Sequence, residues 1–253
     1  MGCPDTVSVL ALDPSNADTS GLQSPMKTAE AFARAVHSKL LATSIFKPVD
    51  LTLRAVGQNF KTSSEIADCL QKVAKDEEAS FIIVFTHLRK NPYFAATFTQ
   101  RLTESGDTPI LAINASASAI DQVQRLLVAT DLTPSAKASF DGAVELAVET
   151  GAELILFHHQ MAPMLEAERE SVTTIAQSWV DEALKRGVAA RAMIITEPRA
   201  TADLIVKAAE DSASDLIVVG HHERSLHLTP AGKLTTRLLS QSTKPVLIIN
   251  KEK

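Results

Sequence analysis

The feature that most constrains this chain is an internal repeat. Three segments of the first half recur in the same order in the second half. The matching segments are VLALDPS (9–15) with LVATDLT (127–133), SFIIVFTHLR (80–89) with DLIVVGHHER (215–224), and TPILAIN (108–114) with KPVLIIN (244–250). The last two pairs are separated by 135 and 136 residues, and the first places Asp13 opposite Asp131. Ordered matches of this kind predict two copies of one structural unit.

The repeat also predicts where the chain divides. The first copy spans residues 1–114 and the second spans residues 124–253. Residues 115–123, ASASAIDQV, are mostly small and polar, as expected of an exposed linker between domains.

Apolar runs and helical patterns alternate along each copy. In the second copy, Thr133 is suited to cap a helix, Pro134 to begin it and Gly151 to end it. The other predicted helices are 164–186, 201–213 and 232–241, and the predicted strands are RLLVATD, ELILFHH, AARAMII, DLIVVG and PVLII. Strands this apolar, separated by helices, predict a parallel sheet covered on both faces. Right-handed crossovers then make each copy a doubly wound α/β domain.

The first copy is shorter in one place. From Pro25 to Thr86 is 61 residues, whereas the equivalent interval from Pro134 to His221 is 87, which leaves a deficit of 26. The missing piece corresponds to the helix at 164–187, so SIFKPV and LTLRAV lie almost next to each other. Parallel neighbours need a long crossover, so either one run is not a strand or the two form an antiparallel edge. We interpret this copy as degenerate, with a supporting role.

Composition excludes several classes of protein. The chain is 45% apolar and 22% charged, so it can bury a core, while its net charge of −5 and 4% aromatic content argue against nucleic-acid binding. No apolar run approaches the roughly 18 residues that would span a bilayer, so no membrane partner is predicted. Cys3 and Cys69 have no metal-type spacing, and a reducing cytoplasm is the expected location.

The second copy resembles the universal stress protein family in its tandem form. The resemblance rests on Asp131 after the first strand, on FHH at the end of the second, on DLIVVGHHERS and on the closing KPVLII strand. It implies two flavodoxin-like domains of five parallel strands that pair through their last strands, PILAI and PVLII. Such an internal pseudo-dimer would cover two sheet edges. Association into a homo-oligomer and binding to a regulated protein are further expectations for such a module.

Nucleotide-binding members of this family resemble one another in a loop, G-x2-G-x9-G-[ST]. Gly220 matches its first glycine, but Glu223 stands in place of the second. The interval to Gly232 is one residue short, and Lys233 replaces the hydroxyl residue. The Glu223 charge would repel a phosphate, whereas Arg224 and Lys233 could pair with one.

The resemblance therefore implies a site for ATP or another nucleotide in the second copy. Its candidate residues are Asp131, Gly220, His222, Arg224, Gly232 and Lys233. The other interpretation of Asp131 is a strand-end acid that caps the following turn. In the first copy, Phe85, Leu88 and Ala96–Thr97 replace the loop residues, so no triphosphate is expected there.

Histidines suggest an alternative. Strands that end together in a doubly wound sheet could gather carboxylate and imidazole groups around Zn²⁺. The candidates are Asp131, His158, His159, His221 and His222. Adjacent histidines on a strand point to opposite faces, however, and no compact ligand spacing is present. A metal-dependent or nucleotide-hydrolysing enzyme using these groups remains the competing hypothesis, with Ser225 as a conceivable nucleophile but no G-x-S-x-G motif. We predict a non-catalytic regulatory module.

Overall fold

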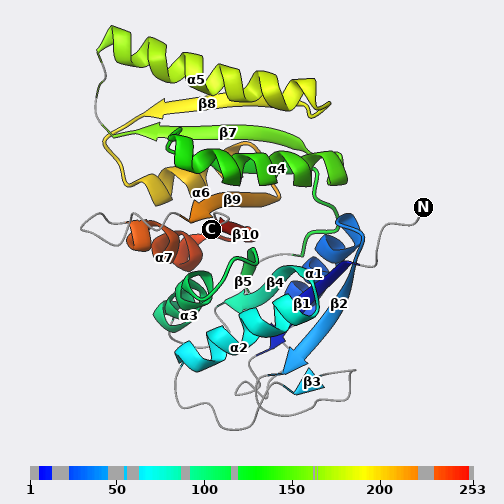
Figure 1. Ribbon diagram of the computed structural model, residues 1–253. Coiled ribbons are helices and arrows are strands. Elements are labelled where there is room, and N and C mark those ends of the chain that lie inside the picture. Colours follow the sequence, from blue (N-terminus) through cyan, green and yellow to red (C-terminus); the bar gives the residue numbers. More distant parts are fainter. Residues whose placement is uncertain are drawn as a thin grey trace.

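The described strands form one mixed sheet of ten (Figure 1). A computed structural model of the chain describes residues 6–12, 23–44, 54–55, 63–86, 92–114, 119–161, 163, 165–221 and 231–250. The strands are β1 (Thr6–Leu12), β2 (Ser38–Ser44), β3 (Arg54–Ala55), β4 (Ala79–Thr86), β5 (Ile110–Asn114), β6 (Arg125–Ala129), β7 (Glu153–Gln160), β8 (Ala190–Thr196), β9 (Leu216–His221) and β10 (Val246–Asn250).

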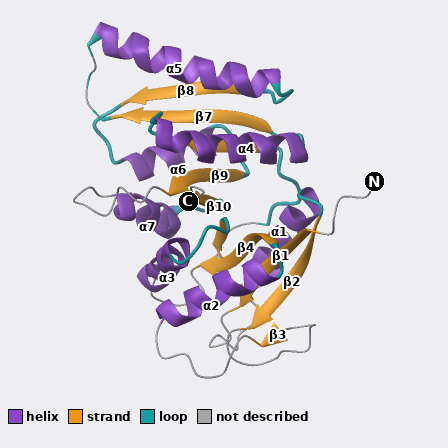
Figure 2. Cartoon of the chain, viewed as in Figure 1, coloured by secondary structure: helices purple, strands orange, loops and turns teal. Residues whose placement is uncertain are grey.

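Helices cover both faces of this sheet (Figure 2). They are α1 (Gln23–Ala35), α2 (Ser63–Asp76), α3 (Pro92–Glu104), α4 (Lys137–Thr150), α5 (Glu166–Lys185), α6 (Thr201–Asp211) and α7 (Ala231–Gln241), with a 3₁₀ turn, η2, at Pro134–Ala136. One apolar cluster lies under α1, α4 and α5, and a second lies under α2, α3, α6 and α7. Both clusters contain residues from both halves of the chain, so the halves share the core on each face of the sheet.

Strand order is the same in both halves. The sheet runs β3-β2-β1-β4-β5-β10-β9-β6-β7-β8, so each half has its first strand in the middle and its last strand at the centre of the whole sheet. Every neighbouring pair is parallel except β5 with β10. The predicted fold class, doubly wound α/β with a largely parallel sheet in each half, is confirmed.

The two halves meet at the antiparallel pair of β5 and β10. Its register joins Leu111 with Leu247, and both side chains are fully buried. α3 packs against α7 over one face of this junction. On the other face, residues 119–123 of the linker bury Val123 in the cluster that both halves share, and the Ile120 N–H donates to the Thr28 hydroxyl oxygen at 3.1 Å. Apolar contacts and hydrogen bonds therefore connect the halves on both faces of the sheet.

The prediction for the shortened region needs correction. The second strand of the first half is β2 (Ser38–Ser44), which ends where the predicted run SIFKPV begins, and the rest of that run lies outside the described residues. Within LTLRAV the described residues are Arg54 and Ala55, and these two pair with β2 in parallel, not antiparallel. Nine residues, 45–53, separate the two described strands, which is fewer than the crossover expected between parallel neighbours.

Local signals set the ends of α4. Pro134 begins the 3₁₀ turn and Gly151 ends the helix in the left-handed region, at φ 70°, where a residue without Cβ is least strained. The predicted cap at Thr133 is absent, because the Thr133 side chain makes no bond to the helix N–H groups. Its hydroxyl instead donates to Asp131, two residues back along the chain. Within the described residues, no helix is long and apolar enough to cross a membrane.

Candidate functional site

The candidate site lies where the strand order of the second half reverses direction. β6 lies between β9 and β7, and the chain leaves β6 for α4 on one face and β9 for α7 on the other. Ala129 is aligned with Val219, so residues 130–131 and 220–221 emerge side by side at the carboxyl edge. Ligands of doubly wound sheets bind in the crevice outside this position.

Asp131 lies at this edge and is exposed. One carboxylate oxygen, Oδ1, accepts the Thr133 N–H at 3.0 Å and the Thr133 hydroxyl at 2.7 Å. This turn places Leu132 in the left-handed region at φ 60° and tucks its side chain into the core. Both interpretations of Asp131 thus remain open, because the turn occupies Oδ1 while Oδ2 has no partner among the described residues.

Gly220 and His221 end β9 on the other side of the switch point. Gly220 is aligned with Ile249 of β10 and is half-buried. Of the remaining predicted nucleotide residues, His222 and Arg224 lie outside the described residues, as does Glu223. Gly232 and Lys233 fall in the first turn of α7, whose backbone is described, but the Lys233 side chain is not. The amino end of α7 therefore lies at the same edge, and its first N–H groups, which have no partner within the helix itself, are suited to an anion.

His158 and His159 use opposite faces of β7. His158 is buried, and its Nδ1 donates to the Thr130 carbonyl oxygen at 2.9 Å. His159 donates from Nε2 to the Glu197 carbonyl oxygen at 2.8 Å and accepts the Thr201 hydroxyl at Nδ1, at 2.9 Å. Since a carbonyl can only accept, these bonds fix the tautomer of each ring. His159 thereby ties the end of β7 to the beginning of α6.

These bonds bear directly on the metal hypothesis. A ring nitrogen must be unprotonated to bind Zn²⁺, and both nitrogens of His159 already have partners. Among the residues that the structure describes, no group of three or more His, Cys, Asp or Glu side chains is arranged to hold a metal ion. His158, His159 and Asp131 are therefore not brought together as the hypothesis required, and His222 lies outside the described residues.

Sequence reasoning missed the residues that position this edge. Thr130 and Thr133 hold the turn, and Thr201 and the Glu197 carbonyl hold His159. The Asp-x-Thr spacing at 131–133 is a local signal for a turn of this kind. Nothing in the sequence indicates the bond between His159 and Thr201, because these residues are 42 positions apart.

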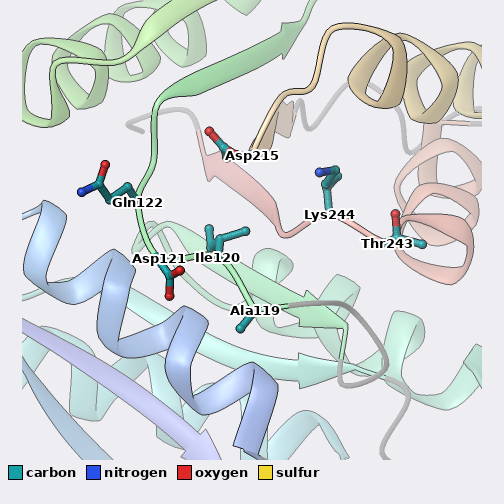
Figure 3. Close-up of a pocket in the computed structure, with 7 residues that line it drawn as sticks. All are labelled: Ala119, Ile120, Asp121, Gln122, Asp215, Thr243 and Lys244. Atoms are coloured by element: carbon teal, nitrogen blue, oxygen red, sulfur yellow. The ribbon is translucent and has the colours of Figure 1, made fainter.

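A cavity of about 370 Å³ lies at the opposite edge, beside the linker (Figure 3). Ala119, Ile120, Asp121, Gln122, Asp215, Thr243 and Lys244 line it. Asp215 Oδ2 accepts the backbone N–H groups of Gln124 and Arg125 at 2.9 and 3.0 Å, which anchors the end of the linker to the segment that precedes β9. The lining residues precede β6, β9 and β10. Asp131 follows β6 and Gly220 lies near the end of β9, so the cavity is at the opposite edge of the sheet from the candidate site.

Comparison with known proteins identifies the second half. The model of the universal stress protein family matches residues 122–250. The chain belongs to the universal stress protein family. No curated protein matches the sequence.

Solved universal stress proteins share the whole fold. One from Archaeoglobus fulgidus DSM 4304 has 14% sequence identity and a TM-score of 0.67, covering 97% of this chain and 97% of its own. Another, from Pseudomonas aeruginosa UCBPP-PA14, has 16% identity and a TM-score of 0.67, covering 98% of this chain and 94% of its own. An A. fulgidus universal stress protein in complex with dAMP has 19% identity and a TM-score of 0.42, covering 50% of this chain and 97% of its own.

The two halves differ in their relation to the family. The match at 122–250 contains Asp131, Gly220 and α7, whereas residues 1–121 lie outside it. At identities this low, the similar structures establish the fold alone. The universal stress domain thus contains the whole candidate site.

Proposed function

We propose that this universal stress protein is a non-catalytic, cytoplasmic binding module of the stress response whose second domain holds a nucleotide. One observation supports the proposal: Asp131 follows β6 and Gly220 lies in β9, two strands paired at the switch point of the second half, and α7 is the helix that follows β9. Residues 124–253 form the ligand-binding domain. Residues 1–114 form a degenerate domain, joined through linker 115–123 and paired with the other through their last strands.

The groups at this edge suit the two ends of a nucleotide. Asp131 Oδ2 can accept a hydrogen bond from a ribose hydroxyl or a base amine, since the turn uses only Oδ1. Gly220 has no Cβ, so a ligand can approach the backbone closely at the end of β9. The N–H groups and the positive dipole end at the amino end of α7 favour a phosphate, with Lys233 in the same turn.

Charge in the loop weakens this binding. Glu223 stands where the related loop has a glycine, and its carboxylate repels phosphate, whereas Arg224 and Lys233 attract it. A nucleotide with fewer phosphate charges suffers less repulsion. The charge of Glu223 should therefore lower the affinity of the protein for AMP less than its affinity for ATP.

Calorimetric titration with ATP–Mg²⁺ and AMP, together with mass spectrometry of the native protein, tests the proposal. Asp131→Asn should weaken binding about fivefold to tenfold, because a carboxylate acceptor is replaced by a weaker neutral one. Asp121→Asn is the matched control, since Asp121 is an exposed acid at the opposite edge. Absence of any nucleotide binding, or equal loss in both variants, would contradict the proposal.

Glu223→Gly is a separate test of the loop. If the Glu223 charge opposes the phosphates, this substitution should tighten ATP binding more than AMP binding. Unchanged affinity for both nucleotides would show that Glu223 does not face the ligand.

A further inference from the structure

The outer edge of β8 has the features of a strand that pairs with another strand. β8 is the last strand of the sheet and lies at its end beneath α5 (Figure 1). It has seven residues in unbroken register with β7, without a bulge. Arg191 is its only charged residue, and it contains no proline or lysine. Proteins usually protect an edge with lysine, proline, a bulge or a short strand, and β8 uses none of these.

The opposite end of the sheet differs. β3 is the strand at that end, and it is only two residues long. A strand this short offers little template for pairing. Of the two ends of the described sheet, β8 is therefore the one suited to extension.

Hydrogen bonds to β7 show which backbone groups of β8 face outward. The Ala189 carbonyl accepts the Leu154 N–H, and the Glu197 N–H donates to the Gln160 carbonyl. Because backbone groups alternate sides along a strand, the odd-numbered residues face β7. The N–H and C=O groups that point to the open edge therefore belong to Ala190, Ala192, Ile194 and Thr196.

We propose that a second copy of this chain docks on this edge, its own β8 running antiparallel with Ile194 on the twofold axis. Ile194 then faces Ile194 of the second copy as a hydrogen-bonded pair, and Ala192 faces Thr196. This ladder contains about six backbone hydrogen bonds. It ends at Pro198, which has no N–H to donate.

Charge complementarity selects this register. With Ile194 on the axis, Arg191 lies opposite Glu197 of the second copy, and the symmetry repeats the pair. Arg191 and Glu197 face each other at a non-hydrogen-bonded position of the ladder, where cross-strand side chains approach most closely. Arg191 uses its Nε for Glu153 at 3.1 Å, which leaves its terminal nitrogens for the second copy. Met193 and Ile195, both half-buried, face each other in the same register.

Neighbouring registers lack this match. Moving the axis to residue 193 places Arg191 opposite Ile195, and moving it to residue 195 places Arg191 opposite Arg199, a pair of like charges. A second copy is therefore favoured over an unrelated strand, because the edge is complementary to itself.

Helix α5 contributes apolar surface beside this edge. On one flank, Glu182 forms an ion pair with Lys137 of α4. Arg186, the residue after the end of α5, forms another with Glu145 of α4. Leu184 lies on the other flank, away from α4, and 49% of its surface is exposed. In the proposed dimer, the two copies of α5 become neighbours on this side, and Leu184 gains an apolar environment.

Sedimentation equilibrium of the full chain, over about 1–200 μM, tests the proposal. The wild-type protein should associate into dimers in this range. Ala192→Pro should abolish the dimer without disturbing the pairing with β7, because the Ala192 N–H faces outward. A protein that is monomeric throughout, or an Ala192→Pro variant that folds and still dimerises, would overturn the proposal.

Charge exchange tests the register. Arg191→Glu and Glu197→Arg should each weaken the dimer about tenfold, because each creates two like-charge pairs across the axis. The double variant should recover most of the wild-type affinity. Arg101→Glu, the same change at an exposed residue of α3, is the control and should have no effect. Circular dichroism verifies folding, and failure of the double variant to recover would refute this register.

Discussion

The shared core makes Leu111 a sensitive test of how the two halves depend on each other. Leu111 lies in β5, is fully buried and is aligned with Leu247 of β10. Leu111→Ala removes one methine and two methyl carbons from a site that β4 and β10 hold on both sides. The cavity therefore cannot collapse easily, and we expect the free energy of unfolding to fall by about 3–4 kcal/mol.

Urea denaturation measures this loss with two signals. Circular dichroism reports on both halves, whereas fluorescence of Trp179, the only tryptophan, reports on the second half. Trp179 is buried against Phe140 at a ring separation of 5.0 Å, far along the chain from the substitution. If the halves unfold together, both signals should shift to lower urea by the same amount, about 1 M for a slope of about 3 kcal/mol/M.

The control for this experiment is Val148→Ala, since Val148 is half-exposed on α4 and its truncation should cost less than about 0.5 kcal/mol. A fluorescence midpoint that stays in place while the dichroism transition splits in two would refute the reasoning. It would show that the second half is stable on its own and that the β5–β10 junction does not couple the halves.

Two further predictions concern packing and charge. Gly106→Ala should destabilise the protein by about 1–3 kcal/mol in the same denaturation assay, because the new Cβ would lie 2.6 Å from Oε1 of buried Gln71, whose Nε2 donates to the Leu102 carbonyl. Glu153→Gln should make the free energy of unfolding less sensitive to acid. Hydrogen bonding to Arg125 lowers the pKa of Glu153 from 4.5, so the ionised carboxylate stabilises the fold above pH 4.5. This stabilisation is lost as the pH falls through the lowered pKa of the folded state. Thermal unfolding at several pH values measures this, and an unchanged pH profile would contradict it.

Much of the fold follows from the repeat and the apolar pattern. Runs such as LIVV (216–219) are apolar throughout because helices cover both faces of the strand, and this pattern predicts a parallel sheet without further information. The pattern failed at β2, because SKLLATS combines a short apolar run with polar residues and resembles a loop more than the neighbouring SIFKPV does. Pairing with β1 along seven positions fixes this strand, and such pairing is not visible in the local sequence.

Less of the site could be predicted. Asp131 and Gly220 were placed correctly at one edge by strand order alone, since both positions follow from where apolar runs end. The role of each histidine could not be predicted, because the local sequence does not distinguish a metal ligand from a histidine that donates to a carbonyl. The role of His159 depends on Thr201 and Glu197, which are distant in the sequence and lie beside it only in the folded chain.

The antiparallel pairing of β5 with β10 gives the molecule two unlike poles. Because the central strands run in opposite directions, the carboxyl edge of the first half faces the same way as the amino edge of the second. One pole thus carries Asp131 and Gly220, and the other carries the linker cavity with Asp215 and Lys244. The two sites therefore lie at opposite ends of β6 and β9, so a ligand at one pole does not block access to the other.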